Sequence, residues 1–165
     1  MTSKQPAKRR LFLLRHAHSS WPRPGEKDFD RSLDDTGRHE ARSVAEMAAS
    51  ADYQPTRILC SPARRCTETV SIFLNAMEHA PEVILDGALY DRDATYYLEK
   101  IEEIEDGQSV LVAGHNPMIE ETFKALSDGD QSAEEWLAGG YHTAGFAVFE
   151  ALKGAKWRLQ GLLSP

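Results

Sequence analysis

Residues 109–117 read Ser-Val-Leu-Val-Ala-Gly-His-Asn-Pro and pass abruptly from apolar to polar side chains. A short apolar run bounded by turn residues is typical of a buried strand, and Gly, Asn and Pro favour a turn. Apolar residues then recur at helical spacing from Met118 to Leu126. The stretch therefore predicts a strand–turn–helix unit with His115 at the carboxyl end of its strand.

Two earlier segments repeat this pattern. Residues 11–14 form an apolar run that stops at Arg15-His16, and residues 57–60 form one that stops at Ser61-Pro62. Proline suits the first turn of a helix, so we expect a helix to follow it. The other expected elements are a helix from Thr36, its cap, to about Ser50, a strand at 82–85, a helix through Tyr96 and Ile104, a hairpin of strands at 144–149 and 156–162, and loops at 21–32 and 127–133.

Strands that alternate with helices predict an α/β fold. We expect a three-layer sandwich in which a mostly parallel central sheet has helices on both faces, and the closing hairpin adds an antiparallel edge. The 165 residues suit a single domain over residues 1–165, since no repeat or linker interrupts them. The basic start, residues 1–9, is expected to form a flexible tail.

The composition narrows the function classes. A net charge of -7 argues against a broad nucleic-acid surface, although a local anion site remains compatible with it. No apolar run approaches the roughly 18 residues of a membrane span, and the apolar run after the basic start is too short for a signal peptide. Cys60 and Cys66 are expected to be free thiols in a reducing compartment. We therefore expect a cytoplasmic monomer without nucleic-acid or membrane partners.

Polar side chains follow three of the expected strands, as Arg15-His16, as Ser61 to Arg65, and as Gly114-His115. Ligands of open α/β sheets bind beyond the carboxyl ends of the strands. Arginine offers a planar fork of donors that matches phosphate oxygens, and a neutral imidazole is a nucleophile near neutral pH. Each motif alone is more often a turn or a helix start. Together, at neighbouring strand ends, they indicate a site for a multiply charged oxyanion.

The same residues carry a family resemblance. Leu-Arg-His-Ala-His-Ser-Ser-Trp at 14–21 resembles the Arg-His-Gly/Ala signature of the histidine phosphatase (phosphoglycerate mutase-like) superfamily. Ser-Pro-Ala-Arg-Arg-Cys-Thr-Glu-Thr at 61–69 resembles its Ser-Pro-x-x-Arg-x-x-x-Thr segment, and residues 112–117 are similar to its Gly-His-Asn-Pro segment. The ordered motifs span residues 14–117 of the chain. The short length and the Ser-Ser-Trp resemble the SixA-type phosphohistidine phosphatase branch.

The resemblance implies a role for each matching residue. His16 would be the nucleophile that becomes phosphohistidine, while Arg15 and Arg65 would bind the phosphoryl oxygens. His115 would be the second histidine of the site, and Ser19 would add a hydrogen bond at its rim or be structural. Many members use an acid after the third strand to protonate the leaving group. Our candidates for it are Asp91 and, second, Asp93, and a position near a helix N-terminus explains both nearly as well.

Two other residues have competing interpretations. Arg64 can face the rim of the site, although a surface position is the simpler interpretation. His16 and His18 have the spacing of a two-histidine metal site, although joint ligation would need a suitable turn after the strand. No further ligands lie nearby at metal spacing. We expect no metal and no cofactor.

The function that the resemblance implies is hydrolysis of a phosphoryl group through a covalent phosphohistidine, on a protein phosphohistidine substrate. The absence of room for a long insertion leaves the site open enough for a side chain of another protein. One alternative is a phosphatase of a small phosphomonoester, such as a sugar or nucleotide phosphate. Another is a phosphate-binding module without turnover, which would need Arg15, Arg65 and His115 but no nucleophile at His16.

Activity should survive removal of divalent metals. Arginines in this site would supply the positive charge that Mg²⁺ supplies in other phosphoryl-transfer enzymes. We expect incubation with EDTA to leave the rate of phosphate release unchanged, as measured with an aryl phosphate. Complete loss of activity, restored by adding a metal back, would contradict this expectation.

Overall fold

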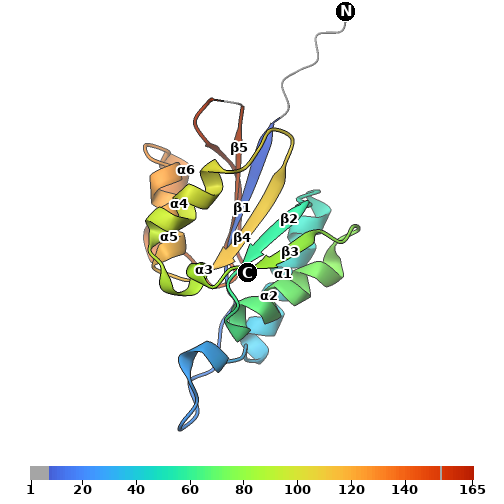
Figure 1. Cartoon of the computed structure of the whole chain (residues 1–165), viewed down its shortest axis with the longest axis vertical. Coiled ribbons are helices and arrows are strands. Elements are labelled where there is room, and N and C mark those ends of the chain that lie inside the picture. Colours follow the sequence, from blue (N-terminus) through green and yellow to red (C-terminus); the bar gives the residue numbers. More distant parts are fainter. Residues whose placement is uncertain (1–7, 153) are drawn as a thin grey trace, which may run out of the picture.

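The computed structural model describes residues 8–152 and 154–165, which fold around a central mixed sheet (Figure 1). The strand order is β3-β2-β4-β1-β5-β6. Pairing is parallel among β3, β2, β4 and β1, and β5 is antiparallel to both β1 and β6. This confirms the predicted α/β class with its antiparallel edge. The strands are β1 (Arg9–Arg15), β2 (Arg57–Cys60), β3 (Glu82–Leu85), β4 (Ser109–Gly114), β5 (Phe146–Ala151) and β6 (Arg158–Leu163).

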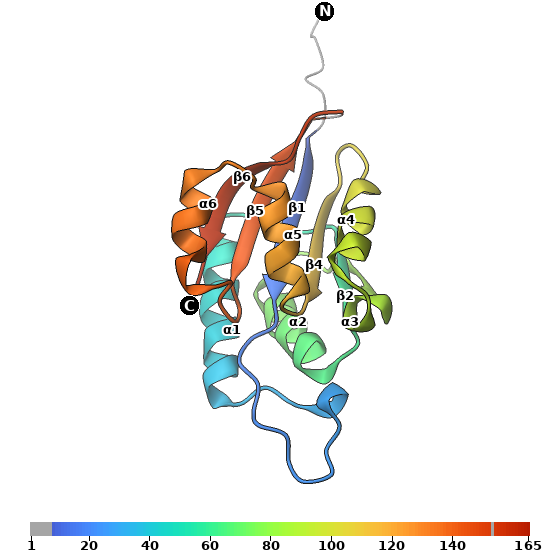
Figure 2. The same cartoon turned by 90° about the vertical axis from the view of Figure 1, so that its left-hand side faces the viewer.

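Helices cover both faces of this sheet, as Figures 1 and 2 show from two sides. The segments α1 and α2 lie on one face, and α4, α5 and α6 lie on the other, with the short α3 before α4. Two 3-10 turns, η1 (Asp28–Asp30) and η2 (Leu137–Gly139), lie in the connections. The helices are α1 (Asp35–Ser50), α2 (Arg64–Ala76), α3 (Ala88–Asp91), α4 (Ala94–Glu102), α5 (Met118–Leu126) and α6 (Gln131–Trp136).

The central strand β1 is buried on both faces. Phe12 and Leu14 belong to the core cluster under α1 and α2, while Leu11 and Leu13 belong to the cluster under α4 and α5. All four side chains are fully buried. Successive side chains of a strand point to opposite faces, so only a continuous apolar run can fill both layers. This is why the strand reads as Leu-Phe-Leu-Leu rather than as an alternating pattern.

The structure corrects the predicted start of the first helix. We expected Thr36 to cap it, but Asp34 is the cap, and its carboxylate accepts a 2.8 Å hydrogen bond from the Gly37 backbone N–H. An aspartate before the first helical residue satisfies an N–H group that has no partner inside the helix. Thr36 lies two residues after this cap, inside the first turn.

The predicted loop at 127–133 is also wrong in its second half. Asp130 accepts a 3.1 Å hydrogen bond from the Ala133 N–H and starts α6 at Gln131. The polar residues of this run are thus a helix cap and an exposed first turn. They carry too little apolar periodicity to reveal a helix of this length.

The structure also corrects the boundary between the expected N-terminal tail and the first strand. Arg9 opens β1, with its guanidinium 4.7 Å from the Trp157 ring centroid and hydrogen-bonded to the Ile104 carbonyl. Lys8 is exposed and contacts Glu150 at 3.3 Å. The expected tail therefore excludes Arg9, and residues 1–7 of it lie outside the described residues.

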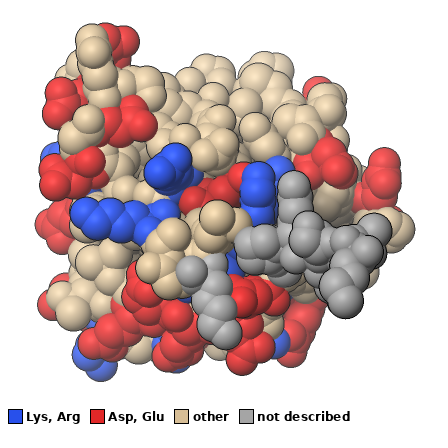
Figure 3. Space-filling model, turned by 90° about the horizontal axis from the view of Figure 1, so that it is seen from above, with Lys and Arg blue, Asp and Glu red and all other residues tan. Residues whose placement is uncertain are grey.

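The end of the molecule from which β1 starts carries charges of both signs. Seen from above, Lys and Arg side chains lie among Asp and Glu side chains on this face (Figure 3). Such a mixture forms no continuous positive surface on the visible part of the face. None of the helices that the structure describes has the length and apolar character needed to cross a membrane.

Gly114, the last residue of β4, has no room for a side chain. A Cβ atom there would lie 2.2 Å from the hydroxyl oxygen of Tyr97, which is itself fully buried. We expect Gly114→Ala to lower the free energy of unfolding by about 1–3 kcal/mol, as overpacking of a core does. Urea unfolding measures this loss. Gly87→Ala, whose new Cβ meets no atom within 4 Å, is the control, and equal losses in the two variants would contradict the expectation.

Candidate active site

The strands β2, β4 and β1 are neighbours, with β4 in the middle. Their registers pair Arg15 with Gly114 and Cys60 with Ala113, so the three carboxyl ends lie level with one another. The polar motifs that follow these strands thus meet at one edge of the sheet, which is the lower end in Figure 1. The ring centroids of His16 and His115 lie 5.3 Å apart.

His16 is held as a neutral imidazole with one defined tautomer. Its Nδ1 lies 2.7 Å from the Ala17 carbonyl oxygen, which can only accept, so Nδ1 carries the ring proton. The lone pair of the neutral ring is therefore on Nε2. Burial lowers the pKa of His16 to about 3, and the positive charges of Arg65 and Arg15 add to this effect. A neutral ring with a free lone pair is the form that can attack phosphorus.

The backbone around this histidine is fixed from two sides. The Ala17 N–H donates to Thr69 Oγ1 at 3.0 Å, and that hydroxyl donates to the Arg65 carbonyl at 2.7 Å. The His16 N–H donates to the Gly114 carbonyl at 3.1 Å. These bonds tie the loop after β1 to α2 and to β4. Because Thr69 is fully buried, this connection is shielded from water.

Arg65 lies in the first turn of α2 with its side chain almost fully buried. Its Nη1 donates to the Asp28 carbonyl at 2.8 Å, and its Nη2 lies 3.0 Å from Asp28 Oδ2 and 3.2 Å from His115 Nδ1. The guanidinium therefore joins the histidine to the η1 turn. Such contacts order the arginine before any ligand arrives, which reduces the entropy that binding must remove.

Asp28 is a site residue that the sequence did not reveal, because it lies in a stretch that we expected to be only a surface loop. Its carboxylate receives 2.9 Å hydrogen bonds from Tyr90 and Arg31 in addition to Arg65. Burial alone would raise the pKa of Asp28, but these bonds and the charge of Arg65 outweigh it and lower the pKa to about 2. No local pattern predicts a contact between residues so distant in the chain.

Two aromatic rings extend the site outward. The edge of Tyr90 packs against His115 with ring centroids 5.5 Å apart, and Phe29 packs against Tyr90 at 5.1 Å. Neither ring could be recognised as functional from the sequence, since both lie in segments without a recognisable motif. They border the imidazole on the side of η1 and α3.

Arg15 is the last residue of β1, and its side chain contacts the segment before β5. Its Nη1 donates a 2.6 Å hydrogen bond to the Tyr141 carbonyl. Its Nε is buried without a partner among the described residues. The charge of Arg15 acts on both His16 and His115, because it lowers the pKa of each. The two arginines therefore border the two histidines, as the motif spacing implied.

His115 is buried between Arg65 and Ser61. Its Nε2 lies 2.8 Å from Ser61 Oγ, on the side away from Arg65. Burial first, and then the charge of Arg65, lower the pKa of His115 to about 4. The ring is therefore neutral in the free protein at neutral pH.

The structure places the remaining predicted residues around this cluster. Ser19 accepts a 2.8 Å hydrogen bond from Arg31, which also binds Asp28, so it belongs to the rim network. Arg64 is exposed and pairs with Glu68 at 2.6 Å, which fits a surface position.

Asp91 and Asp93 lie at the junction of α3 and α4. Asp91 is the exposed last residue of α3, and Asp93 caps α4. In the part of the chain that the structure describes, no hydrogen bond or ion pair joins either aspartate to His16, His115 or the two arginines. The role of Asp91 as the leaving-group acid stays a prediction.

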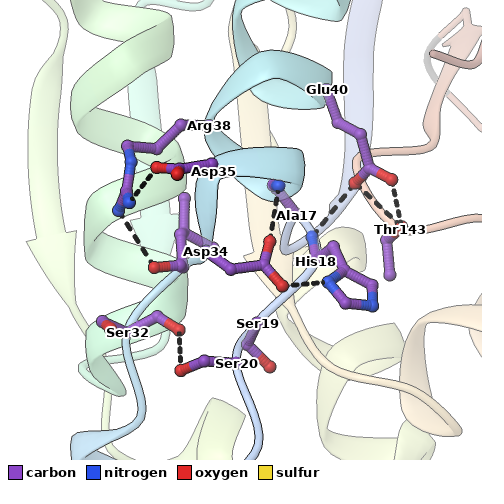
Figure 4. A network of polar contacts seen from close by, with 12 residues as sticks. Ala17, His18, Ser19, Ser20, Ser32, Asp34, Asp35, Arg38, Glu40 and Thr143 are labelled. Carbon is purple, nitrogen blue, oxygen red and sulfur yellow. Dashed lines mark hydrogen bonds and ion pairs between the residues drawn. The ribbon is translucent and has the colours of Figure 1, made fainter.

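His18 lies in a polar network beside the loop after β1 (Figure 4). Its Nδ1 is 2.5 Å from Asp34 Oδ2, and its backbone N–H donates to Glu40 at 3.0 Å. Glu40 also accepts from the Thr143 hydroxyl at 2.9 Å. Figure 4 shows the His18 ring directed toward Asp34. The network therefore links the start of α1 to the loop before β5.

Comparison with known proteins identifies the family. The profile of the histidine phosphatase superfamily, branch 1, matches residues 11–97, which include the first two motifs. The chain belongs to the histidine phosphatase superfamily. The third motif, around His115, lies beyond the matched range. The match thus confirms the family resemblance found in the sequence.

Similar proteins extend over almost the whole chain. An uncharacterised chloroplastic protein of Arabidopsis thaliana is 34% identical over 95% of this chain and 78% of its own length. The crystal structure of a candidate phosphohistidine phosphatase SixA from Agrobacterium tumefaciens is 35% identical, with a TM-score of 0.83 over 97% of this chain and 99% of its own. The protein histidine phosphatase SixA complexed with tungstate is 20% identical, with a TM-score of 0.76 over 94% and 97%, and shares the fold.

The buried neutral histidines should make the stability of this superfamily member depend on pH. The pKa values of His16 and His115, about 3 and about 4, lie below the ordinary 6.5. At a pH between these values and 6.5, the two histidines are protonated in the unfolded chain and neutral in the folded protein. The stability that these two histidines contribute by staying neutral is therefore full above pH 6.5 and is lost as the pH decreases. When the pH is lowered from 7 to 5, we expect the free energy of unfolding of His16→Gln to fall by roughly 2 kcal/mol less than that of the wild type.

Urea unfolding at the two pH values measures this difference. His39→Gln serves as the control, since His39 is an exposed histidine on α1. Its loss between pH 7 and pH 5 should equal that of the wild type. A His16→Gln variant with the same pH dependence as the wild type would mean that His16 is not held neutral in the folded protein.

Proposed function

We propose that this protein is a metal-independent phosphatase that works through a phosphohistidine at His16. The observation that carries the proposal is the hydrogen bond from His16 Nδ1 to the Ala17 carbonyl. It reserves Nε2 as the nucleophilic atom, in a ring that burial keeps neutral. The membership of the histidine phosphatase superfamily supports the same chemistry.

The first step transfers the phosphoryl group to the enzyme. Nε2 of His16 forms a bond to phosphorus as the bond between phosphorus and the leaving atom breaks, and the leaving group takes its electron pair. Charge on the transferring oxygens is stabilised by the guanidinium groups of Arg15 and Arg65. The His16 ring becomes positively charged as it is phosphorylated, and the Ala17 carbonyl stabilises the Nδ1–H of that ring.

The second step regenerates the enzyme. A water molecule attacks phosphorus, the bond to Nε2 breaks, and inorganic phosphate leaves with His16 neutral again. The proton that the leaving group needs in the first step comes from Asp91 or from water. An imidazole leaving group depends little on a strong acid, so the exposed position of Asp91 is compatible with this substrate.

Protein phosphohistidine is the substrate class that we favour. The 35% identity over nearly the full length to a candidate phosphohistidine phosphatase supports it. The length of the chain also fits this class, because it leaves little room for a long insertion over the site. A small phosphomonoester is the alternative that the substrate panel below tests. Turnover distinguishes both from a module that only binds phosphate.

Trapping the intermediate tests the chemistry. We expect the wild type, mixed with a ³²P-labelled phosphodonor and quenched without acid, to retain label that is stable to base and labile to acid. His16→Ala should carry no label and should lose about 10³-fold or more in turnover, since removal of a nucleophile leaves only binding and charge stabilisation. Turnover by wild type without such label, or equal turnover by His16→Ala, would overturn the proposed mechanism.

A substrate panel tests the substrate class. A phosphohistidine-containing protein, sugar phosphates and nucleotides are compared by kcat/KM, with His39→Gln as the matched surface-histidine control. We expect the highest kcat/KM on the phosphohistidine protein. A higher value on a sugar or nucleotide phosphate would replace the substrate class and leave the mechanism in place.

A further inference from the structure

The two ring nitrogens of His115 have different surroundings. Nδ1 lies 3.2 Å from Nη2 of Arg65, which borders the site. Nε2 lies 2.8 Å from Ser61 Oγ and 3.4 Å from Cys66 Sγ, and the side chains of both residues are fully buried. Only Nδ1 therefore lies on the side where a phosphoryl group can bind. Ser61 begins the second motif, but its position alone suggested no more than a helix start.

These contacts define the tautomer of the free protein. A guanidinium has donors and no acceptor, so the Nδ1 that it contacts must offer a lone pair. The neutral ring then carries its proton on Nε2 and donates it to Ser61 Oγ. The Ala63 N–H also points to this oxygen, at 3.3 Å. Ser61 is thus an acceptor for the buried side of the ring.

A bound phosphoryl group reverses what is required of Nδ1. Phosphoryl oxygens are acceptors, so a lone pair on Nδ1 would repel them, whereas an N–H would bind them. The proton on Nε2 faces the buried interior, where Ser61 Oγ accepts it and Cys66 Sγ lies beside it. While Ser61 Oγ keeps accepting the Nε2–H, the ring presents a donor to the ligand by gaining a second proton, at Nδ1.

We propose that Ser61 is a positioning residue that holds His115 for this change, so that binding of a tetrahedral dianion brings one proton from solvent to Nδ1. Ser61 Oγ accepts the Nε2–H before and after binding, and Arg65 turns its Nη2 donor from Nδ1 to the dianion. The inference rests on the proposed function, in which the phosphoryl group binds between Arg65 and His115.

The surrounding charges support this coupling. In the free protein, burial and Arg65 keep the pKa of His115 at about 4. A dianion at Nδ1 would offset the charge of Arg65 and favour the imidazolium. The titratable and charged groups around the ring come from several elements: Arg15, His16, Asp28, Arg65, Cys66, Tyr90 and Tyr97.

Inorganic sulfate is the probe, because it is a tetrahedral dianion that does not titrate near neutral pH. We expect the affinity of the wild type for sulfate to rise about tenfold for each unit of pH decrease between pH 7 and pH 5, which is the slope for uptake of one proton. Calorimetry in buffers of different ionisation enthalpy should count one proton per sulfate. His115→Gln should abolish the slope, which distinguishes His115 from His16.

The Ser61 variants test the positioning role. Ser61→Ala leaves the Nε2–H without an acceptor. We therefore expect the dependence of sulfate affinity on pH to flatten and the affinity at pH 5 to fall about tenfold. Ser61→Thr retains a hydroxyl and should restore the pH dependence. Ser127→Ala, which removes another buried serine hydroxyl bond, is the control. A purely structural role for Ser61 would lower affinity equally at all pH values and contradict the inference.

Nitrogen-15 NMR of the histidine rings in the wild type tests the same point without a variant. We expect the His115 signals to show a proton on Nε2 alone in the free protein and on both nitrogens with sulfate bound. An unchanged ring, or no sulfate binding, would overturn the inference. Neither result depends on turnover, so trapping of the phosphohistidine still decides the proposed function separately.

Discussion

The pairing of β4 with both β1 and β2 is the constraint on which the site depends. Parallel registers bring the ends of these strands to one level, and only then do His16 and His115 lie within 5.3 Å of each other. The pairing in turn needs the apolar runs of the three strands, which are covered by helices on both faces. Residues separated by about a hundred positions therefore form one site because of backbone hydrogen bonds between neighbouring strands.

The site also combines two requirements that oppose each other. A phosphoryl group needs buried positive charge, but buried charge is costly unless it has partners. Asp28 and carbonyl oxygens supply such partners to Arg65 and Arg15, and the histidines avoid the cost by staying neutral. Charge is thereby held on the arginines and kept off the nucleophile.

The sequence was sufficient where local patterns decide the structure. Apolar runs ending in polar residues predicted the parallel strands, and the three motifs predicted His16, Arg65 and His115 as neighbours. It was insufficient where a single long-range contact decides. Asp28 and Tyr90 meet Arg65 and His115 only after the chain has folded, and nothing in their local sequence separates them from other surface residues. The choice of Asp34 over Thr36 as the helix cap likewise depended on a shift of two residues.

The contact between Asp28 and Arg65 has an evolutionary consequence. The connection between β1 and α1 has the prolines, glycine and charges of a segment that normally tolerates insertions and deletions. Here its η1 turn carries the counterion of a buried arginine. A change in the length of this connection would move that carboxylate, so a viable variant must supply another anion or lose an ordered arginine. Evolutionary change in the length of this loop is thus limited by the charge of Arg65, which belongs to α2.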